Sequence, residues 1–112
     1  MKQAILDTSF IITCVKQKID FFEKMELEGI EIIIPLQVIN ELKGLKSNIS
    51  LKLLEKNSFK KIDLKTKNVD EGIKNFAYKN KNAIVATLDR GLKMKIRNPK
   101  LVIRGTKKLE IL

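Results

Sequence analysis

The sequence predicts an α/β fold of the three-layer α/β/α type, in which helices cover both faces of a central parallel sheet of four to five strands. Short apolar runs, rich in β-branched residues, alternate along the chain with amphipathic stretches. This alternation is typical of successive strands and helices joined by right-handed crossovers. A length of 112 residues suits one packed core, so we expect residues 1–112 to form a single domain.

The first strand and the first helical segment fall within the first 28 residues. The apolar run at residues 4–6 predicts a strand. Residues 8–28 predict a helix, in one or two pieces, with Thr8 or Ser9 as its N-cap and Gly29 as its end. The chain then turns back toward a second strand.

The middle of the chain predicts two strands separated by helices. Residues 30–34 are almost all isoleucine, as expected of a strand buried on both faces, and Pro35 suits the first turn of a helix. Two helices are expected at about residues 36–46 and 51–56. Residues 59–64 predict a weaker strand at the edge of the sheet.

The C-terminal part continues the same alternation. Residues 68–78 predict a helix that opens with an Asn-x-x-Glu capping box, and residues 83–86 predict a short buried strand. A capped helix is expected at residues 89–96, and a strand at residues 101–103. The basic tail, residues 104–112, is open to forming one more strand at an edge.

The composition excludes several kinds of catalysis. Without histidine, the chain has no Ser-His-Asp or Cys-His arrangement and no zinc site that uses histidine. The single Cys14 excludes an all-cysteine zinc site and an internal disulfide, and its apolar neighbours favour a buried structural thiol. Any hydrolysis must therefore depend on carboxylates, lysines or a bound metal.

The charge favours a polyanionic partner. Lysine and arginine total 23 against 13 acidic residues, a formal net charge of +10, which suits nucleic acid. A lysine-rich proteome is the alternative explanation. No apolar run approaches the roughly 20 residues of a membrane-spanning helix, so we expect a cytoplasmic protein with no membrane partner.

Two aspartates follow predicted strands. Asp7 comes directly after residues 4–6, and Asp89 comes shortly after residues 83–86. Ligands of open parallel sheets bind beyond the carboxyl ends of the strands, so neighbouring strands would bring both side chains to one rim. For either aspartate alone, the N-cap of a helix is the favoured explanation.

Two further acids lie on predicted helices. Glu41 borders the apolar stripe of Val38, Leu42 and Leu45, so we expect it to be partly shielded, with a surface salt bridge as the alternative. Asp70 lies in the first turn of its helix, where it also stabilises the helix dipole.

Together, the four acids point to a metal site. Carboxylates gathered at one edge of a sheet repel one another and have raised pKa values unless a cation neutralises them. A ligand set made only of oxygens favours Mg²⁺ or Mn²⁺. Such an ion can activate water against a phosphodiester without any histidine.

Four ordered motifs resemble those of the PIN domain ribonucleases, over nearly the whole chain. They are Leu6-Asp7-Thr8-Ser9, Pro35 with Val38-Ile39-Asn40-Glu41-Leu42, Asp70-Glu71-Gly72-Ile73 before Phe76-Ala77, and Ile84-Val85-Ala86-Thr87-Leu88-Asp89. The resemblance implies an Mg²⁺- or Mn²⁺-dependent endoribonuclease. It implies that the acidic positions Asp7, Glu41, Asp70 and Asp89 are catalytic and bind the metal.

The resemblance also implies supporting residues and partners. Ser9 and Thr87 are expected to hydrogen-bond a carboxylate or a metal-bound water. Similar proteins include toxins of the VapC class, paired with antitoxins, and factors that process ribosomal RNA, so an antitoxin and a homodimer remain open as partners beside RNA. Many members carry one more acid where this chain has Leu92 and Lys93, which leaves a second metal open.

Basic residues are expected to flank the acidic pocket and bind phosphates. Arg90, Lys93 and Arg97 share one face of the predicted last helix, and Arg104 follows the last strand. A solvated helix face is the alternative.

Two other functions compete with a ribonuclease. A signalling receiver domain has a similar length, but that family typically has an adjacent acidic pair after the first strand, where this chain has Leu6-Asp7-Thr8. A non-catalytic PIN-like domain that binds RNA or acts as a scaffold would keep the acids only as caps and dipole partners.

Overall fold

The computed structural model describes residues 2–112, which form a six-stranded sheet in the order β3-β2-β1-β4-β5-β6. Strands β1 to β5 are parallel, and β6 pairs antiparallel with β5. The strands are β1 (Lys2–Leu6), β2 (Ile30–Pro35), β3 (Lys60–Ile62), β4 (Ile84–Ala86), β5 (Lys100–Arg104) and β6 (Lys108–Ile111).

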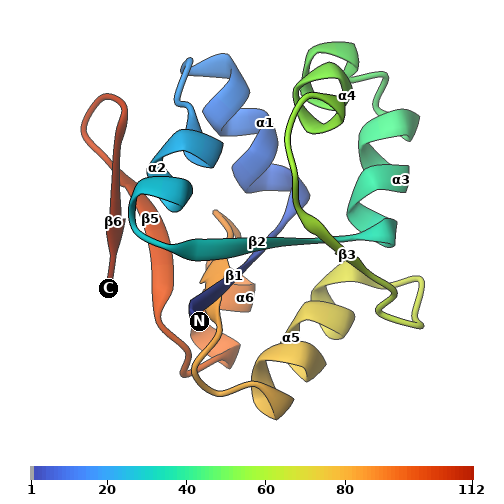
Figure 1. Cartoon of the computed structure of the whole chain (residues 1–112). Coiled ribbons are helices and arrows are strands. Elements are labelled where there is room, and N and C mark those ends of the chain that lie inside the picture. The colour runs from blue at the N-terminus through green and yellow to red at the C-terminus, as the bar shows by residue number, and fades with distance from the viewer. Residues whose placement is uncertain (1) are drawn as a thin grey trace.

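Helices cover both faces of this sheet, which gives three layers. Helices α1 to α4 lie on one face, and α5 and α6 lie on the other (Figure 1). The helices are α1 (Thr8–Lys16), α2 (Phe21–Leu27), α3 (Leu36–Gly44), α4 (Asn48–Glu55), α5 (Val69–Lys79) and α6 (Arg90–Lys95). The predicted three-layer α/β/α fold is therefore confirmed.

The core lies around the three central strands. Ile5, Ile33 and Val85 occupy equivalent register positions on β1, β2 and β4, and each is at most 1% exposed. Burial on both faces explains why these strands are continuous apolar runs and do not alternate apolar with polar residues. Cys14 belongs to the same core, and its burial raises the pKa of its thiol to about 12.

The sheet has six strands where four to five were expected. The sixth, β6, is formed by the basic tail, in which exposed Lys108 and Glu110 alternate with half-buried Leu109 and Ile111. A period of two is the pattern of a strand with one solvated face. None of the helices formed by residues 2–112 has the length and apolarity needed to cross a membrane.

Three local predictions are wrong. The N-cap of α1 is Asp7, whose side chain accepts from the Thr8 amide, and not Thr8 or Ser9. Helix α4 begins at Asn48, three residues before the predicted start, because the chain turns at Lys46 with a positive φ of 55°. Leu45 was expected on a buried stripe but is 62% exposed, because α3 ends at Gly44 and Leu45 is its C-cap.

Candidate active site

Asp7 is the most buried of the four candidate acids. The register that pairs Leu6 with Ala86 brings the ends of β1 and β4 together, and the Asp7 amide donates to the Ala86 carbonyl at 2.9 Å. Beyond this point the chain leaves β1 and β4 toward opposite sides of the sheet, which is where open α/β sheets bind ligands. Asp7 is only 5% exposed.

Three hydrogen bonds fix the Asp7 carboxylate. It accepts from the Thr8 amide at 2.7 Å, from Thr87 Oγ1 at 2.7 Å and from Ser9 Oγ at 3.3 Å. Burial raises the pKa of Asp7, and the charge of Glu41 acts in the same direction, whereas these hydrogen bonds lower it. The raised pKa means that the folded site disfavours this negative charge unless a cation is present.

Thr87 and Ser9 connect the first and fourth strands at the site. Thr87 is fully buried, donates to Asp7, and accepts from the Asp89 amide at 3.1 Å. Ser9 accepts from the Leu88 amide at 3.2 Å. These hydroxyls therefore orient the Asp7 carboxylate and the backbone that carries Asp89.

Asp89 lies at the start of α6. Its carboxylate caps the helix by accepting a hydrogen bond from the Leu92 amide at 3.1 Å, so Asp89 is the N-cap of α6, as the alternative explanation expected. The cap uses one oxygen, Oδ1, as hydrogen-bond acceptor. A carboxylate has about four lone-pair sites, so capping leaves it capacity to bind another group.

Glu41 comes to the site from α3. Its carboxylate accepts a hydrogen bond from Thr8 Oγ1, and its charge acts on both Asp7 and Asp70. The expectation that Glu41 is partly shielded is wrong, because the residue is exposed. Helix α3 packs against α1 and α4, but these contacts leave the Glu41 side chain exposed.

Asp70 lies within electrostatic reach of the other three acids. Burial raises its pKa, and so do the charges of Asp89, Asp7 and Glu41 and a hydrogen bond with Asp89. The structure therefore brings together, within electrostatic reach, four acids that lie far apart in the sequence. Asp7 forms the floor of this site, and the exposed Glu41 and Asp70 lie at its mouth.

No basic side chain forms an ion pair with these four acids within the part of the chain that is described. The one ion pair found among residues 2–112 joins Arg104 and Glu110 at 3.3 Å, at the edge of the sheet. Four unpaired carboxylates in a chain of net charge +10 are a donor set that fits a hard divalent cation. Within the same residues, no three acidic side chains converge closely enough to form a ready-made coordination shell.

The sequence matches the family described as PIN like domain over residues 4–105. The chain belongs to this PIN family. Ribonuclease VapC4 of Methanocaldococcus jannaschii is 34% identical over 127 aligned positions, which cover 99% of this chain and 97% of the relative. The solved structure of the PIN domain endonuclease Utp24 superposes with a TM-score of 0.84 at 30% identity, covering 97% of this chain and 90% of that one.

The predicted phosphate-binding residues of this PIN domain do not all lie on one helix. Arg90 and Lys93 lie on α6, but Arg97 does not share their face, because α6 ends at Lys95 and Ile96 is extended. Arg97 follows in the extended segment after α6 and is exposed, and its neighbour Asn98 donates hydrogen bonds to the carbonyls of Ala77 and Asn80. Arg104 is engaged with Glu110.

Two basic residues near the acids were missed from the sequence. Lys74 of α5 and Lys95 of α6 line a cavity of about 240 Å³ together with Asp70 and Asp89. Lys74 follows Asp70 by four residues, the spacing that places side chains on one helix face, so its position near Asp70 could have been predicted from the sequence. Lys95 had no such signal, because its position depends on how α6 packs beside α5.

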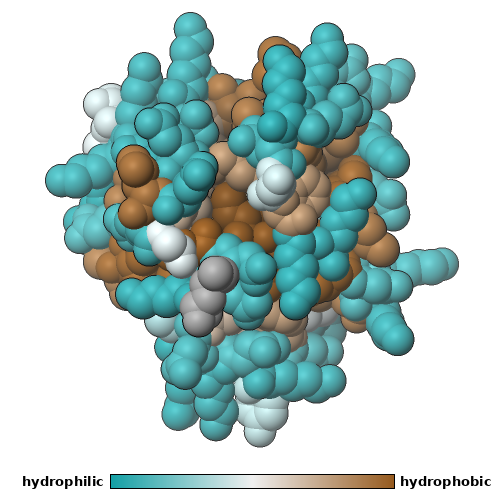
Figure 2. Space-filling model, viewed as in Figure 1, coloured by the Kyte–Doolittle hydropathy of each residue, from teal (hydrophilic) through white to brown (hydrophobic). Residues whose placement is uncertain are grey.

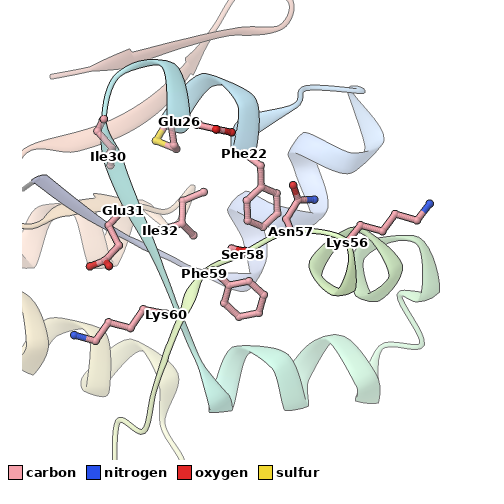
Figure 3. Close-up of a pocket in the computed structure, with 12 residues that line it drawn as sticks. Phe22, Glu26, Ile30, Glu31, Ile32, Lys56, Asn57, Ser58, Phe59 and Lys60 are labelled. Carbon is pink, nitrogen blue, oxygen red and sulfur yellow. The ribbon is translucent and has the colours of Figure 1, made fainter.

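A separate hollow of about 710 Å³ lies away from the acids. Phe22, Ile32 and Phe59 line it between α2, the beginning of β2 and the segment before β3 (Figure 3). The space-filling view shows apolar surface there, ringed by hydrophilic side chains (Figure 2). The hollow opens at the amino end of β2, whereas Asp7 lies at the opposite edge of the sheet.

Proposed function

We propose that this chain is a divalent-metal-dependent endoribonuclease whose active site is the four-carboxylate group of Asp7, Glu41, Asp70 and Asp89. The observation that carries the proposal is the electrostatic effect of these acids on one another at the carboxyl edge of the sheet, with no ion pair to a basic side chain among residues 2–112. The names ribonuclease and endonuclease, carried by two similar proteins, support RNA as the substrate.

The same four acids would hold the cation, and a ligand set of oxygens favours Mg²⁺ or Mn²⁺ over softer ions. A divalent cation bound there supplies a Lewis acid that lowers the pKa of water and stabilises charge on phosphate oxygens. The position that carries a further acid in many PIN proteins holds Leu92, which is 3% exposed and packs in the core. We therefore propose one cation and not two.

Each side chain has its own role in this proposal. Asp7 is the fixed ligand, because the Thr8 amide and the hydroxyls of Ser9 and Thr87 orient it before anything binds. Asp70 lies within electrostatic reach of Asp89, and the charge of Asp89 helps to raise the pKa of Asp70. A cation bound there would favour the ionised form of Asp70, so protons and the cation would compete for this site.

The experiment that tests this function is an RNA cleavage assay with Mn²⁺ or Mg²⁺, with and without EDTA. Wild type is compared with Asp7→Asn, Asp89→Asn and the control Glu55→Gln, which alters an exposed acid on α4. We expect EDTA and the two aspartate substitutions to abolish cleavage, and the control to cleave as wild type does. Cleavage that survives both aspartate substitutions would overturn the proposal.

A toxin with an antitoxin partner is our proposal for the wider role. The match to Ribonuclease VapC4, which extends over nearly the full length of both chains, supports this role. Expression of the chain should arrest growth, and co-expression of a small protein encoded beside it should relieve the arrest. If the Asp7→Asn variant also arrested growth, this role would be contradicted, because nuclease activity would then not be the cause of the arrest.

A non-catalytic RNA-binding or scaffolding domain is the alternative, and the capping roles of Asp7 and Asp89 are the observation that favours it. In that case the four acids would not have to bind a metal ion. A calorimetric titration with Mn²⁺ that gives no heat of binding, together with tight RNA binding in EDTA, would favour the alternative.

A further inference from the structure

The positive charge of this chain is unevenly distributed. Residues 72–112 carry 11 basic and 2 acidic side chains, whereas residues 1–71 carry 12 basic and 11 acidic ones. Almost the whole net charge of +10 therefore belongs to the part that contains most of α5, all of α6 and strands β4 to β6. Helices α5 and α6 form the layer opposite α1 to α4 (Figure 1). They carry five basic and two acidic side chains, whereas α1 to α4 carry four of each, so the layer of α5 and α6 is the more basic one.

A ridge on α5 leads away from the acidic site. Asp70, Lys74 and Tyr78 follow one another at intervals of four residues, so their side chains stack along one face of the helix. The buried stripe of α5, which includes Ile73 and Ala77, faces the sheet, so the ridge lies on the outer side. Eight residues of helix separate Asp70 from Tyr78, a distance of about 12 Å.

Lysines lie on or beside this ridge at two levels. Near the acids, Lys74 and Lys95 line the cavity between α5 and α6. At the far end, the ammonium group of Lys81 lies 5.9 Å from the centre of the Tyr78 ring, which is 78% exposed. An exposed aromatic ring beside a lysine is the combination on which proteins stack the bases of single strands.

The far end of the ridge is held rigidly. The side-chain amide of Asn98 donates to the carbonyls of Ala77, Asn80 and Ala83, at 3.1, 2.8 and 3.0 Å. These bonds fix the end of α5 and the turn that carries Lys81. A ring on a fixed backbone loses less conformational entropy when a base stacks on it than a ring on a mobile loop.

We propose that this ridge binds the RNA strand on one side of the cut, with Lys74 and Lys95 on its phosphates and Tyr78 stacked on a base. At about 3.4 Å per nucleotide of stacked strand, 12 Å places that base about three to four nucleotides from the site of cleavage. One aromatic ring selects for single strands without reading their sequence. This inference rests on the proposed ribonuclease function and extends it to the placement of the substrate.

The test measures binding of a fluorescent 12-nucleotide single-stranded RNA by anisotropy in EDTA, where no cleavage occurs. We expect Tyr78→Ala to weaken binding about fivefold or more, and Tyr78→Phe, which keeps the ring, to bind as wild type does. Lys74→Ala should lower the slope of log affinity against log salt by about 0.7. The matched control Lys52→Ala, on α4 in the opposite layer, should leave both affinity and slope unchanged.

The outcomes separate this inference from the proposed function. If Tyr78→Ala and Lys74→Ala bind the RNA like wild type, the ridge is not the RNA path, whether or not the protein cleaves RNA. An equal loss of RNA affinity in Lys52→Ala would also overturn the inference, since binding would then depend on the total charge of the protein and not on the ridge. If binding depends on Tyr78 but wild type does not cleave RNA with Mn²⁺, the nuclease proposal fails and the RNA-binding ridge stands.

Discussion

The hydroxyl of Thr87 makes one buried and one partly buried hydrogen bond in the site, so replacing it tests how the site is built. In Thr87→Val the shape of the side chain is kept, but the bonds to the Asp7 carboxylate and from the Asp89 amide are lost. Thr87→Ser keeps the hydroxyl and removes one methyl group. The pair of variants therefore separates the hydrogen bonds from the packing.

The expected magnitude follows from these contacts. A hydrogen bond to a charged group contributes about 1.5–3 kcal/mol, and a buried group left without a partner costs about 1–3 kcal/mol. Because the bond to Asp7 is 2.7 Å long and both residues are buried, we expect Thr87→Val to lose about 2–4 kcal/mol of unfolding free energy. Thr87→Ser should lose about 1 kcal/mol for the missing methyl group.

Urea unfolding followed by circular dichroism measures both values, and Mn²⁺ titration of the folded variants measures the effect on the site. We expect Thr87→Val to bind Mn²⁺ about 10- to 100-fold more weakly, because the Asp7 carboxylate is no longer oriented. The reasoning would be refuted if the valine and serine variants unfolded at the same urea concentration and bound Mn²⁺ equally well.

Three further results are expected. Because the pKa values of Asp7 and Asp70 are raised in the folded protein, the metal-free fold binds more protons than the unfolded chain, so their contribution to stability should fall as the pH rises above about 3.9. Urea midpoints measured across pH should show this decline, and Asp7→Asn should reduce it. Asp89→Asn should keep the cap of α6 and change stability by less than about 0.5 kcal/mol, whereas Asp89→Ala should lose about 1 kcal/mol in the same assay. The Cys14 thiol, with a pKa of about 12, should react with maleimide in urea but not in buffer, as mass spectrometry would show; equal labelling in both would contradict its burial.

The fold was predictable because its signals are local. The isoleucine run of β2 and the capping residue Asn68 of α5 depend only on neighbours in the sequence, and the structure has both elements. The end of α6 was harder to predict from the sequence. Arg97 has helical spacing from Arg90 and Lys93, but Asn98 bonds to carbonyls of α5 and the turn after it, and these contacts are distant in sequence.

The four candidate acids could be selected from the sequence, but their geometry could not. The position of Asp7 and Asp89 after strands allowed the expectation that they share a rim, and Asp70 now connects them electrostatically. The exposure of Glu41 could not be read from its helical position, because it depends on how much of the rim α1 covers. The link from Thr87 to the Asp89 amide likewise depends on the turn between β4 and α6.

The central claim, that the four carboxylates bind one divalent cation, is tested most directly by calorimetric titration with Mn²⁺ at neutral pH. Wild type is expected to bind one Mn²⁺ per chain, Asp7→Asn to lose at least about tenfold in affinity, and Glu55→Gln to bind as wild type does. Equal binding by wild type and Asp7→Asn would contradict the claim, and so would an equal loss of affinity in Glu55→Gln.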